Sequence, residues 1–461
     1  MKPPFDIAAD LDTPVSAYLK LASLAPRYLL ESVEGGERLA RYSFLGFGDA
    51  HEIRMRHDGL QVGQQHFPRP VRRDEYLDAL RMALGDAPRP LPQVEGLPFS
   101  GGLVGVSGYD VVRLFERLPG KRKVQGDIPD AAFVATSSVL VFDHLTRRVA
   151  LLHDGMEQER QVLRKNVIRL LRGPIPVNGS KIRISVATAG LDAKQYAERV
   201  NACKEYIAAG DIYQIVLSVL FRGESNVAPF EVYRALRLLN PSPYMFYLDF
   251  GDLQLAGSSP EALVKLNGRQ ASLRPIAGTL PRGATAAEDQ GNEATLLADP
   301  KESAEHVMLV DLARNDLGRV AIPGTIVVDP YRAIERYSHV MHIVSGVQGE
   351  LAPQYDAFDL FAACFPAGTL VGAPKVRAME IIDEMEQTGR GLYAGTAGYF
   401  GVGGDMDQAI TIRTLVFHGD EYSFQAGAGI VADSSPQKEY QEVLAKGAIL
   451  RSALQIAGEG L

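Results

Sequence analysis

Residues 192–221 read DAKQYAERVNACKEYIAAGDIYQIVLSVLF, a stretch that joins a helical pattern directly to a strand pattern. Its first half is amphipathic, with apolar side chains at helical spacing at Tyr196, Val200, Cys203 and Ile207. Asp192 is a plausible helix N-cap and Gly210 a helix stop, while the apolar run over 212–221 predicts a strand. In the rest of the chain, helices and strands do not alternate as a regular βαβ series. The pattern therefore favours an α+β fold over a doubly wound parallel sheet.

A turn-rich segment, RGPIPVNGS at 172–180, follows a predicted helix over 155–171. Its two prolines, two glycines and Asn-Gly pair are typical of a linker. We therefore expect an N-terminal region over 1–172 and a C-terminal region over 190–461. The N-terminal region carries strand-like runs such as AFVATSSVLVF at 132–142 among loops rich in glycine and proline.

The composition excludes several classes of protein. The 461-residue chain has a formal net charge of −8, so it lacks the basic surface of a nucleic-acid-binding protein. Its two cysteines, Cys203 and Cys364, cannot form a disulfide scaffold and suit a reducing compartment. The sequence opens with no secretory signal pattern, and no apolar run is long enough to span a membrane. We expect a soluble, cytoplasmic protein that binds neither nucleic acid nor membrane.

Two predicted helices each present a pair of acids three residues apart. One starts at Asp299-Pro300 and places Glu302 and Glu305 on a single face. The other opens after residue 435 and carries Glu439 and Glu442 at the same spacing. Acids in a first helical turn also favour the helix dipole, so each pair alone could be a solvated surface. If the two helices converge, four carboxylates suit Mg²⁺ more than zinc, because hard cations prefer oxygen ligands.

Three further segments carry weaker signals. The run QAGAGI at 425–430 could hold a carboxylate or phosphate through backbone N–H groups, although a tight turn between strands has the same pattern. The segment GTLVGAPK at 368–375 lacks the residue order of a phosphate-binding loop. Arg413 lies in an apolar stretch over 409–417 that predicts a strand, where it needs either a salt bridge or a carboxylate-bearing ligand.

Three single residues each have both a structural and a functional interpretation. Lys446 stands four positions after Glu442 and could form an ordinary helical ion pair with it. His342 could be a core histidine or a proton-transfer group. His306 follows Glu305 directly and is a lesser candidate for the metal site.

Longer motifs recur along the chain: LLES (29–32), RYSFLG (41–46), GSSPE (257–261), RPIAGT (274–279), KESAEHVMLVDLARND (301–316), GTLVGAPK (368–375) and QAGAG (425–429). In content and order this set resembles the chorismate-utilising enzymes, and among them the component I chains of anthranilate synthase. The resemblance covers nearly the whole chain. It implies an anthranilate synthase-like α+β fold, in which large β-sheets pack as a sandwich with helices on the outside.

The resemblance also implies roles for individual residues. The positions that match the family's Mg²⁺ ligands are Glu302, Glu305, Glu439 and Glu442, with the metal chelating the ring carboxylate of chorismate. The positions that match the substrate pocket are Gly278, Thr279, Tyr393, Arg413, Gly427, Ala428, Gly429 and Lys446. The positions that match the proton-transfer groups are Glu261 and Thr369, near the leaving hydroxyl, and His342, near the enolpyruvyl group.

Two positions indicate which reaction the resemblance implies. Gln214 stands where the relatives that use water as nucleophile carry a lysine, and a neutral amide cannot act as that base. Ala277 stands where aminodeoxychorismate synthases carry a nucleophilic lysine, and alanine forms no covalent adduct. We therefore expect ammonia to attack directly and pyruvate to leave, which is anthranilate synthesis. The alternatives are aminodeoxychorismate or aminodeoxyisochorismate synthesis, and a catalytically silent tryptophan-binding regulatory protein.

Regulation and partners follow from the same resemblance. LLES at 29–32 and NPSPYMF at 240–246 resemble the segments of a tryptophan feedback site, whose contacts would be Ser32, Pro243, Tyr244 and Met245. Neither cysteine lies in the G-x-C-x-G context of a glutaminase nucleophile. We therefore expect a separate glutamine amidotransferase subunit that supplies ammonia, a heterotetrameric assembly, and a role in the first step of tryptophan biosynthesis.

Overall fold

The structure is a computed structural model that describes residues 4–32, 41–120, 123, 125–176, 182–337 and 340–461. Its helices are α1 (Pro14–Lys20), α2 (Arg73–Gly85), α3 (Glu157–Leu171), α4 (Ala193–Ala208), α5 (Pro229–Leu239), α6 (Ala286–Ala298), α7 (Pro300–Gly318), α8 (Ala357–Cys364), α9 (Lys375–Met385) and α10 (Pro436–Glu459). Short 3-10 turns are η1 (Ala22–Leu24), η2 (Tyr109–Leu114) and η3 (Gly368–Leu370).

The strands of the first half are β1 (Ile7–Ala8), β2 (Tyr28–Glu31), β3 (Tyr42–Met55), β4 (Leu60–Val62), β5 (Gln65–Phe67), β6 (Gly102–Ser107), β7 (Ala131–Asp143), β8 (Arg148–His153), β9 (Thr188–Ala189), β10 (Gln214–Glu224), β11 (Tyr244–Asp249) and β12 (Leu253–Ser259). Those of the second half are β13 (Ala262–Asn267), β14 (Gln270–Leu273), β15 (Ile276–Pro281), β16 (Val327–Val328), β17 (Ala333–Arg336), β18 (Val340–Val344), β19 (Val347–Glu350), β20 (Gly372–Ala373), β21 (Thr396–Gly401), β22 (Met406–Ile410), β23 (Thr414–His418) and β24 (Glu421–Ile430).

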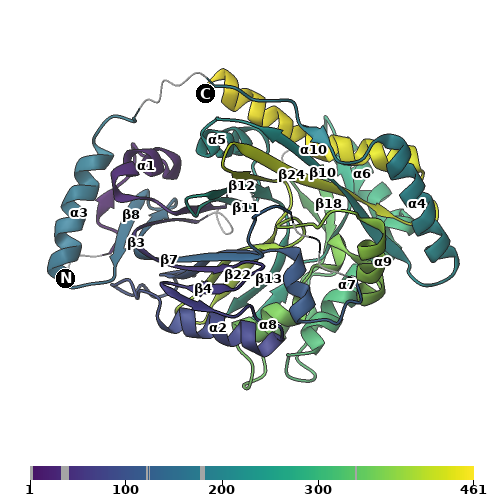
Figure 1. The fold of residues 1–461 in the computed structure, drawn as a ribbon, viewed down its shortest axis with the longest axis horizontal. Coiled ribbons are helices and arrows are strands. Elements are labelled where there is room, and N and C mark those ends of the chain that lie inside the picture. Colours follow the sequence, from purple (N-terminus) through teal and green to yellow (C-terminus); the bar gives the residue numbers. More distant parts are fainter. Residues whose placement is uncertain (1–3, 33–40, 121–122, 124, 177–181, 338–339) are drawn as a thin grey trace.

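The strands form one large curled sheet and one small sheet. Over the described ranges, 21 strands belong to a single hydrogen-bonded network, while β15, β18 and β17 form a separate sheet. Strands from the N-terminal and C-terminal regions pair directly, since β6 lies beside β21 and β2 lies beside β11, both antiparallel. Figure 1 shows the helices at the periphery of this sheet. The division at 172–190 stays a prediction, because both regions contribute strands to the same sheet.

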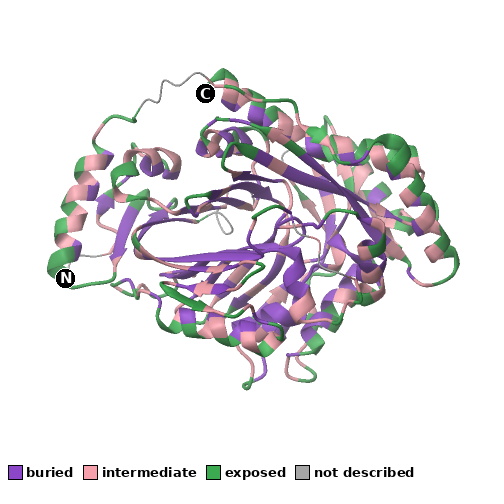
Figure 2. Cartoon of the chain, viewed as in Figure 1, coloured by how far each residue is buried: buried purple, intermediate pink, exposed green. Residues whose placement is uncertain are grey.

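Two hydrophobic layers explain this arrangement. The first lies between facing parts of the curled sheet and contains Phe44, Val104, Phe246 and Leu255, among others, from β3, β6, β11 and β12. The second packs the helices against the outer faces of the sheet. Figure 2 shows the buried residues concentrated on the strands, whereas the peripheral helices expose one side. The predicted α+β class is confirmed, with the sandwich formed mainly by one sheet that folds over itself.

The stretch that decided the fold behaves as its pattern predicts. Asp192 caps α4 by accepting from the N–H of Gln195, and the Gln195 side chain bonds back to the Asp192 N–H. Gly210 follows the helix with a φ of +82°, and β10 begins at Gln214, two residues later than predicted. The predicted helix starts at Pro300 and Pro436 are also present.

One predicted strand is wrong. The stretch over 409–417 breaks into β22 and β23, because β22 pairs with β13 and β21 whereas β23 pairs with β12 and β24. The chain must therefore change position in the sheet between Ile410 and Thr414. Arg413 makes this turn with a left-handed φ of +48°. Among the helices that the structure describes, none has both the length and the apolar character that crossing a membrane requires.

Candidate active site

The first acid pair lies at the start of α7. The Asp299 side chain accepts hydrogen bonds from the N–H groups of Lys301 and Glu302, which fixes the first turn. Glu302 and Glu305 are both half-buried. Burial, and then the charge of Glu305, raise the pKa of Glu302 above its ordinary value. This turn therefore holds two close carboxylates whose repulsion a bound cation would relieve.

Strand β15 approaches this pair through a glycine. Gly278 sits at a bulge in the β15–β18 pairing with a φ of +63°. A Cβ there would lie 3.1 Å from Oε2 of Glu302 and 2.9 Å from Leu296. Only glycine both adopts this conformation readily and leaves the carboxylate room. The RPIAGT motif thus lets the backbone of β15 pass beside the acid pair.

His342 lies on β18, directly opposite Thr279 on β15. Its Nδ1 is 2.9 Å from the carbonyl oxygen of Gly278 and 3.1 Å from Oγ1 of Thr279. A carbonyl can only accept, so the network assigns the proton of the neutral ring to Nδ1 and leaves Nε2 as the basic nitrogen. The ring of Tyr337 meets the imidazole edge-on, with centroids 5.6 Å apart.

Glu261 and Thr369 form a direct pair. Oγ1 of Thr369 donates to Oε1 of Glu261 at 2.8 Å. Burial raises the pKa of Glu261 to about 7, against the lowering effects of that hydrogen bond and of the charges of Lys446 and Arg413. Both residues line a cavity of about 40 Å³, together with Arg274. A carboxyl group with this pKa can give up a proton near neutral pH.

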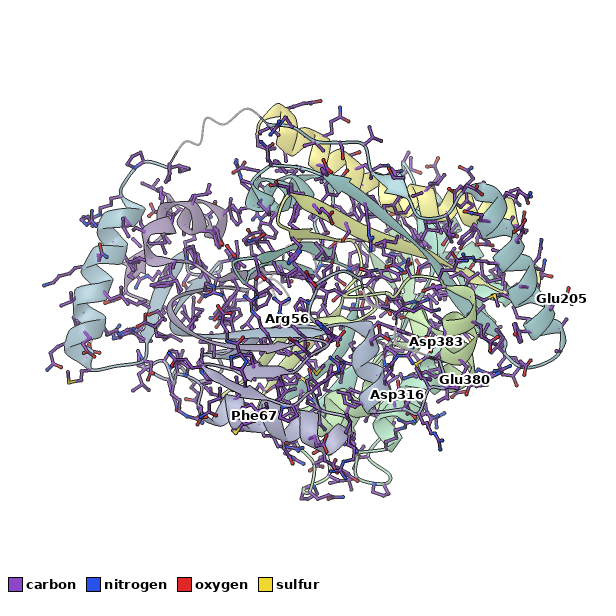
Figure 3. All side chains as sticks on the ribbon, in the orientation of Figure 1. Arg56, Phe67, Glu205, Asp316, Glu380 and Asp383 are labelled. Atoms are coloured by element: carbon purple, nitrogen blue, oxygen red, sulfur yellow. The ribbon has the colours of Figure 1, made fainter. Side chains whose placement is uncertain are left out.

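A buried ion pair holds the segment that carries Thr369. Lys375, the first residue of α9, donates to both carboxylate oxygens of Asp316 on α7 at 2.9 Å and to the carbonyl of Cys364 at 3.3 Å. Asp316 is labelled in Figure 3. The lysine of GTLVGAPK thus connects two helices and fixes η3 between them, which is a structural role.

The glycine run lies in β24, which pairs with β10 over its whole length. Ser218 of β10 lies opposite Gly427, and its N–H points away from β24 to Glu386. The N–H groups of Gly427 and Gly429 therefore point away from β10, because such pairs alternate along an antiparallel ladder. Ala428 occupies the alternate position, with its N–H directed toward β10 and its methyl group fully buried.

Three side chains lie next to Gly427 and Gly429 of β24. The Tyr393 hydroxyl lies 2.8 Å from where a Cβ of Gly427 would be, and Nε2 of Gln214 lies 2.8 Å from that of Gly429. The same Gln214 nitrogen is 3.4 Å from Oε1 of Glu305, so it connects β10 to the acid pair. Lys446 on α10 donates to the Gly427 carbonyl at 2.9 Å and forms an ion pair with Glu442 at 2.7 Å.

Arg413 is half-buried in the turn before β23. Its carbonyl accepts from the N–H of Ser258 at 3.1 Å, and its Nη1 donates to Oδ1 of Asn240 at 3.4 Å. The positive charge of Arg413 also lowers the pKa of Glu261. The bond to Ser258 therefore connects the Arg413 turn to the segment that leads into Glu261, and the guanidinium favours the charged form of that carboxyl group.

The second acid pair lies on α10. Glu439 is half-buried and Glu442 is exposed, and both charges contribute to the raised pKa of Tyr196. Within the described ranges, no group of three or more His, Cys, Asp or Glu side chains is close enough to hold a metal ion. Mg²⁺ often binds through one or two carboxylates with substrate and water completing the shell, so the Glu302–Glu305 pair fits it. The four-carboxylate site stays a prediction.

His306 differs from the candidate metal ligands in its environment. Its side chain is fully buried, and Nε2 is 2.7 Å from Oγ of Ser345. Burial lowers its pKa to about 4, so the ring is neutral.

The predicted tryptophan contacts gather at one end of the β2–β11 pair. Met245 lies opposite Glu31, so Ser32 and Tyr244 leave this pairing at the same end. Ser32, Pro243 and Tyr244 are half-buried, whereas Met245 is buried in the hydrophobic core. The structure thus brings together two segments that are far apart in the sequence.

The sequence reasoning missed a buried ion pair behind Tyr393. Arg390 donates to both oxygens of Glu386, at 2.8 and 2.9 Å, and is 1% exposed. Its guanidinium lies 5.8 Å from the Tyr393 ring centroid, and Oε1 of Glu386 accepts from the hydroxyl of Ser218 at 2.7 Å. Two opposite charges at i and i+4 were the available signal, but that spacing is equally common on exposed helix faces.

Comparisons with known proteins identify the family of the chain. A family model described as chorismate binding enzyme matches residues 25–452. Anthranilate synthase component 1 of Thermus thermophilus is 46% identical over 98% of this chain and 97% of its own length. That of Aquifex aeolicus is 45% identical over 98% and 94%. The crystal structure of anthranilate synthase component I from Streptococcus pneumoniae has a TM-score of 0.79 at 34% identity, covering 98% and 100%. The chain therefore belongs to the family of chorismate-binding enzymes.

Proposed function

We propose that the chain is the chorismate-converting subunit of an anthranilate synthase. In this reaction chorismate and ammonia give anthranilate, pyruvate and water. Relatives that carry this activity in their names are 45–46% identical over nearly the whole chain. The site supplies a proton donor at Glu261, a cation-binding acid pair at Glu302 and Glu305, and a neutral amide between that pair and the glycine run.

Gln214 is the observation that carries the choice of nucleophile. Its amide nitrogen contacts both Glu305 and the position next to Gly429, which puts it between the acid pair and the substrate-holding strand. A lysine here would be a base able to activate water, whereas an uncharged amide can orient ammonia but accepts no proton from it. Ala277 on β15 also provides no amine that could form a covalent adduct at that position.

In the first step, ammonia forms a bond to the chorismate ring and the ring hydroxyl leaves as water. Glu261 donates the proton that the leaving oxygen requires, because a pKa of about 7 keeps a substantial fraction of its carboxyl group protonated. Thr369 holds the carboxyl oriented through its 2.8 Å hydrogen bond.

In the second step, the aminated ring loses a proton and its enolpyruvyl group, which departs as pyruvate, and the ring becomes aromatic. The basic Nε2 of His342 is our candidate for the proton transfer, since Nδ1 is held by Gly278. Thr279 and the Tyr337 ring keep the imidazole in this orientation.

The substrate carries two carboxylates, and we assign a separate set of residues to each. Glu302 and Glu305, with Glu439 and Glu442 on α10, would hold a Mg²⁺ ion that takes the ring carboxylate and stabilises developing negative charge. Arg413, Lys446, the Tyr393 hydroxyl and the N–H groups of Gly427 and Gly429 would take the other. These donors are the types that bind carboxylates most strongly.

The proposal also includes a partner subunit and a regulatory ligand. We propose that a glutamine amidotransferase subunit supplies the ammonia, because the relatives are named as first components and this chain shows no glutaminase motif. We also propose that tryptophan binds where β2 and β11 end together, next to Ser32, Pro243, Tyr244 and Met245.

The test is a product assay on the purified chain. Chorismate, Mg²⁺ and an ammonium salt at alkaline pH should give anthranilate and pyruvate in equal amounts, identified by mass. An aminated ring that keeps its enolpyruvyl group would refute anthranilate synthesis and support the sibling reactions. Unchanged chorismate, with folding verified by circular dichroism, would refute catalysis.

A further inference from the structure

A second cavity lies on the far edge of β10. It has a volume of about 320 Å³ and opens between the segment 188–191, the loop 386–388 and helix α4. The edge of β10 is covered by β20 at residues 214–215 and by β9 at residues 221–222. The backbone between these short strands is capped by a side chain, since the Ser218 N–H ends on Glu386. The interruption of pairing at this edge creates the cavity.

Two arginines line this cavity, Arg199 on α4 and Arg222 on β10. Arg199 is half-buried, and no residue that the structure describes forms a hydrogen bond or ion pair with its guanidinium. Burial lowers the pKa of Arg199, and the charge of Glu386 opposes this only in part, because Glu386 is itself paired with Arg390. A partly desolvated guanidinium facing open space is stabilised when an anion enters.

The one acidic residue that lines the cavity, Glu386, is already bonded to other residues of the protein. Glu386 accepts from both the N–H and hydroxyl of Ser218, and from two nitrogens of Arg390. Because Arg390 balances its charge, the lining retains the positive charge of the two arginines. In a chain of net charge −8, this is a local reversal of sign.

The rest of the lining is apolar or hydroxylic. Ala189, Leu191 and Leu220 form the apolar wall, while Thr188 and Thr388 add hydroxyl groups. A volume of about 320 Å³ falls at the lower end of the range for small-molecule sites and exceeds what a bare inorganic anion would fill. The cavity therefore has a positively charged end next to an apolar wall.

We propose that this cavity is a binding site for a small organic carboxylate, with Arg199 binding the carboxylate group and Leu191 and Leu220 contacting its apolar body. The site is distinct from the chorismate pocket, although Ser218 lies next to both. Its side chain is bonded to Glu386 at the cavity, and its neighbour across the strands is Gly427. The proposal does not depend on the reaction proposed above.

The probe is 4-bromobenzoate, with neutral 4-bromobenzamide as its matched control. Calorimetric titrations use the full chain with chorismate and Mg²⁺ in excess and no ammonia, so that the substrate pocket is filled. We expect 4-bromobenzoate to bind with 1:1 stoichiometry and the amide to bind about tenfold or more weakly, the range expected for a charge-assisted pair. Anomalous diffraction from bromine in soaked crystals locates the molecule.

Variants of Arg199 test whether 4-bromobenzoate binds in this cavity and not elsewhere on the protein. Arg199→Gln should weaken 4-bromobenzoate binding about tenfold, and Arg199→Lys should restore part of the loss. Arg169→Gln, an exposed residue of α3 bonded only to Asn166 among the described residues, should change nothing. Equal affinity in Arg199→Gln, bromine only in the substrate pocket, or binding of inorganic phosphate without 4-bromobenzoate would each overturn the proposal. If Arg199→Gln unfolds, Arg222→Gln provides the same comparison from the other side of the cavity.

Discussion

Replacing Glu261 with glutamine tests the central step. The amide keeps the size of the side chain and still accepts a hydrogen bond from Thr369, but it cannot donate the proton that the leaving hydroxyl needs. General acids contribute about 10²- to 10⁴-fold, so kcat for anthranilate formation should fall by at least about 100-fold while KM for chorismate changes little.

The pKa of Glu261 also predicts the shape of the pH profile. With a pKa of about 7, about nine tenths of the carboxyl groups are protonated at pH 6 and about one tenth at pH 8. At a fixed concentration of unprotonated ammonia, the wild-type rate should therefore decline above pH 7. The residual activity of Glu261→Gln should lack this decline.

Stability gives an independent readout of the same group. Burial raises the pKa of Glu261 from 4.5 to about 7, so between these values the folded state keeps a proton that the unfolded chain has released. Its contribution to stability is therefore greatest below pH 4.5 and is lost as the pH rises to 7, by up to about 3 kcal/mol. Glutamine does not titrate, so the variant should gain thermal stability relative to wild type between pH 5 and pH 8.

The assay combines stopped-time anthranilate fluorescence with thermal unfolding, both across that pH range. Glu205→Gln, an exposed acid of α4 labelled in Figure 3, is the matched control and should match wild type in both. A Glu261→Gln enzyme within threefold of the wild-type kcat would refute the proton-donor role. A stability difference that does not vary with pH would refute the raised pKa.

Three other perturbations follow from the same geometry. Thr369→Val removes a hydrogen bond that lowers the pKa of Glu261, so the decline in rate should move to higher pH, which a pH–rate profile would detect. Gly427→Ala puts a methyl group 2.8 Å from the Tyr393 hydroxyl, and should raise KM for chorismate and destabilise the fold by about 1–3 kcal/mol; an unchanged KM would contradict the assignment of this strand. Glu302→Gln should raise the Mg²⁺ concentration for half-maximal rate about tenfold or more, and chelation should abolish wild-type activity reversibly; an unaltered Mg²⁺ dependence would remove Glu302 from the metal site.

Local patterns predicted the elements well where one signal dominated. The cap at Asp192 and the proline after Asp299 fixed helix starts, because these groups satisfy or remove N–H donors within a single turn. The prediction of one strand over 409–417 was wrong because the stretch is mostly apolar throughout, which reflects the burial of most of its residues. Nothing in that composition marks where the chain leaves one pair of neighbouring strands for another, and Arg413 is the one charged residue in it.

The site was predicted as a set of residues and not as a geometry. Spacing placed Glu302 and Glu305 on one face, and in the structure the charge of Glu305 raises the pKa of Glu302. That Gln214 contacts Glu305, or that Gly278 passes beside Glu302, depends on which strands meet in space. Such contacts join residues about 20 to 90 positions apart, beyond the range of any helical or strand period.

The alternation of directions along β10 explains why this strand can contribute to two different sites. Gln214 and Ser218 lie an even number of residues apart, so their side chains point to the same face, toward the glycines of β24. Their position in the ladder also sends the Ser218 N–H to the opposite edge, where Glu386 caps it beside the arginine-lined cavity. A substitution that shifted the register of β10 by one residue would exchange these directions, and would remove both the amide beside Glu305 and the capped edge at once. Conversely, changing Arg199 alters only the cavity and leaves the register intact. Binding of 4-bromobenzoate and turnover of chorismate should therefore be separable by side-chain substitutions at Arg199, and inseparable by backbone changes within 214–218.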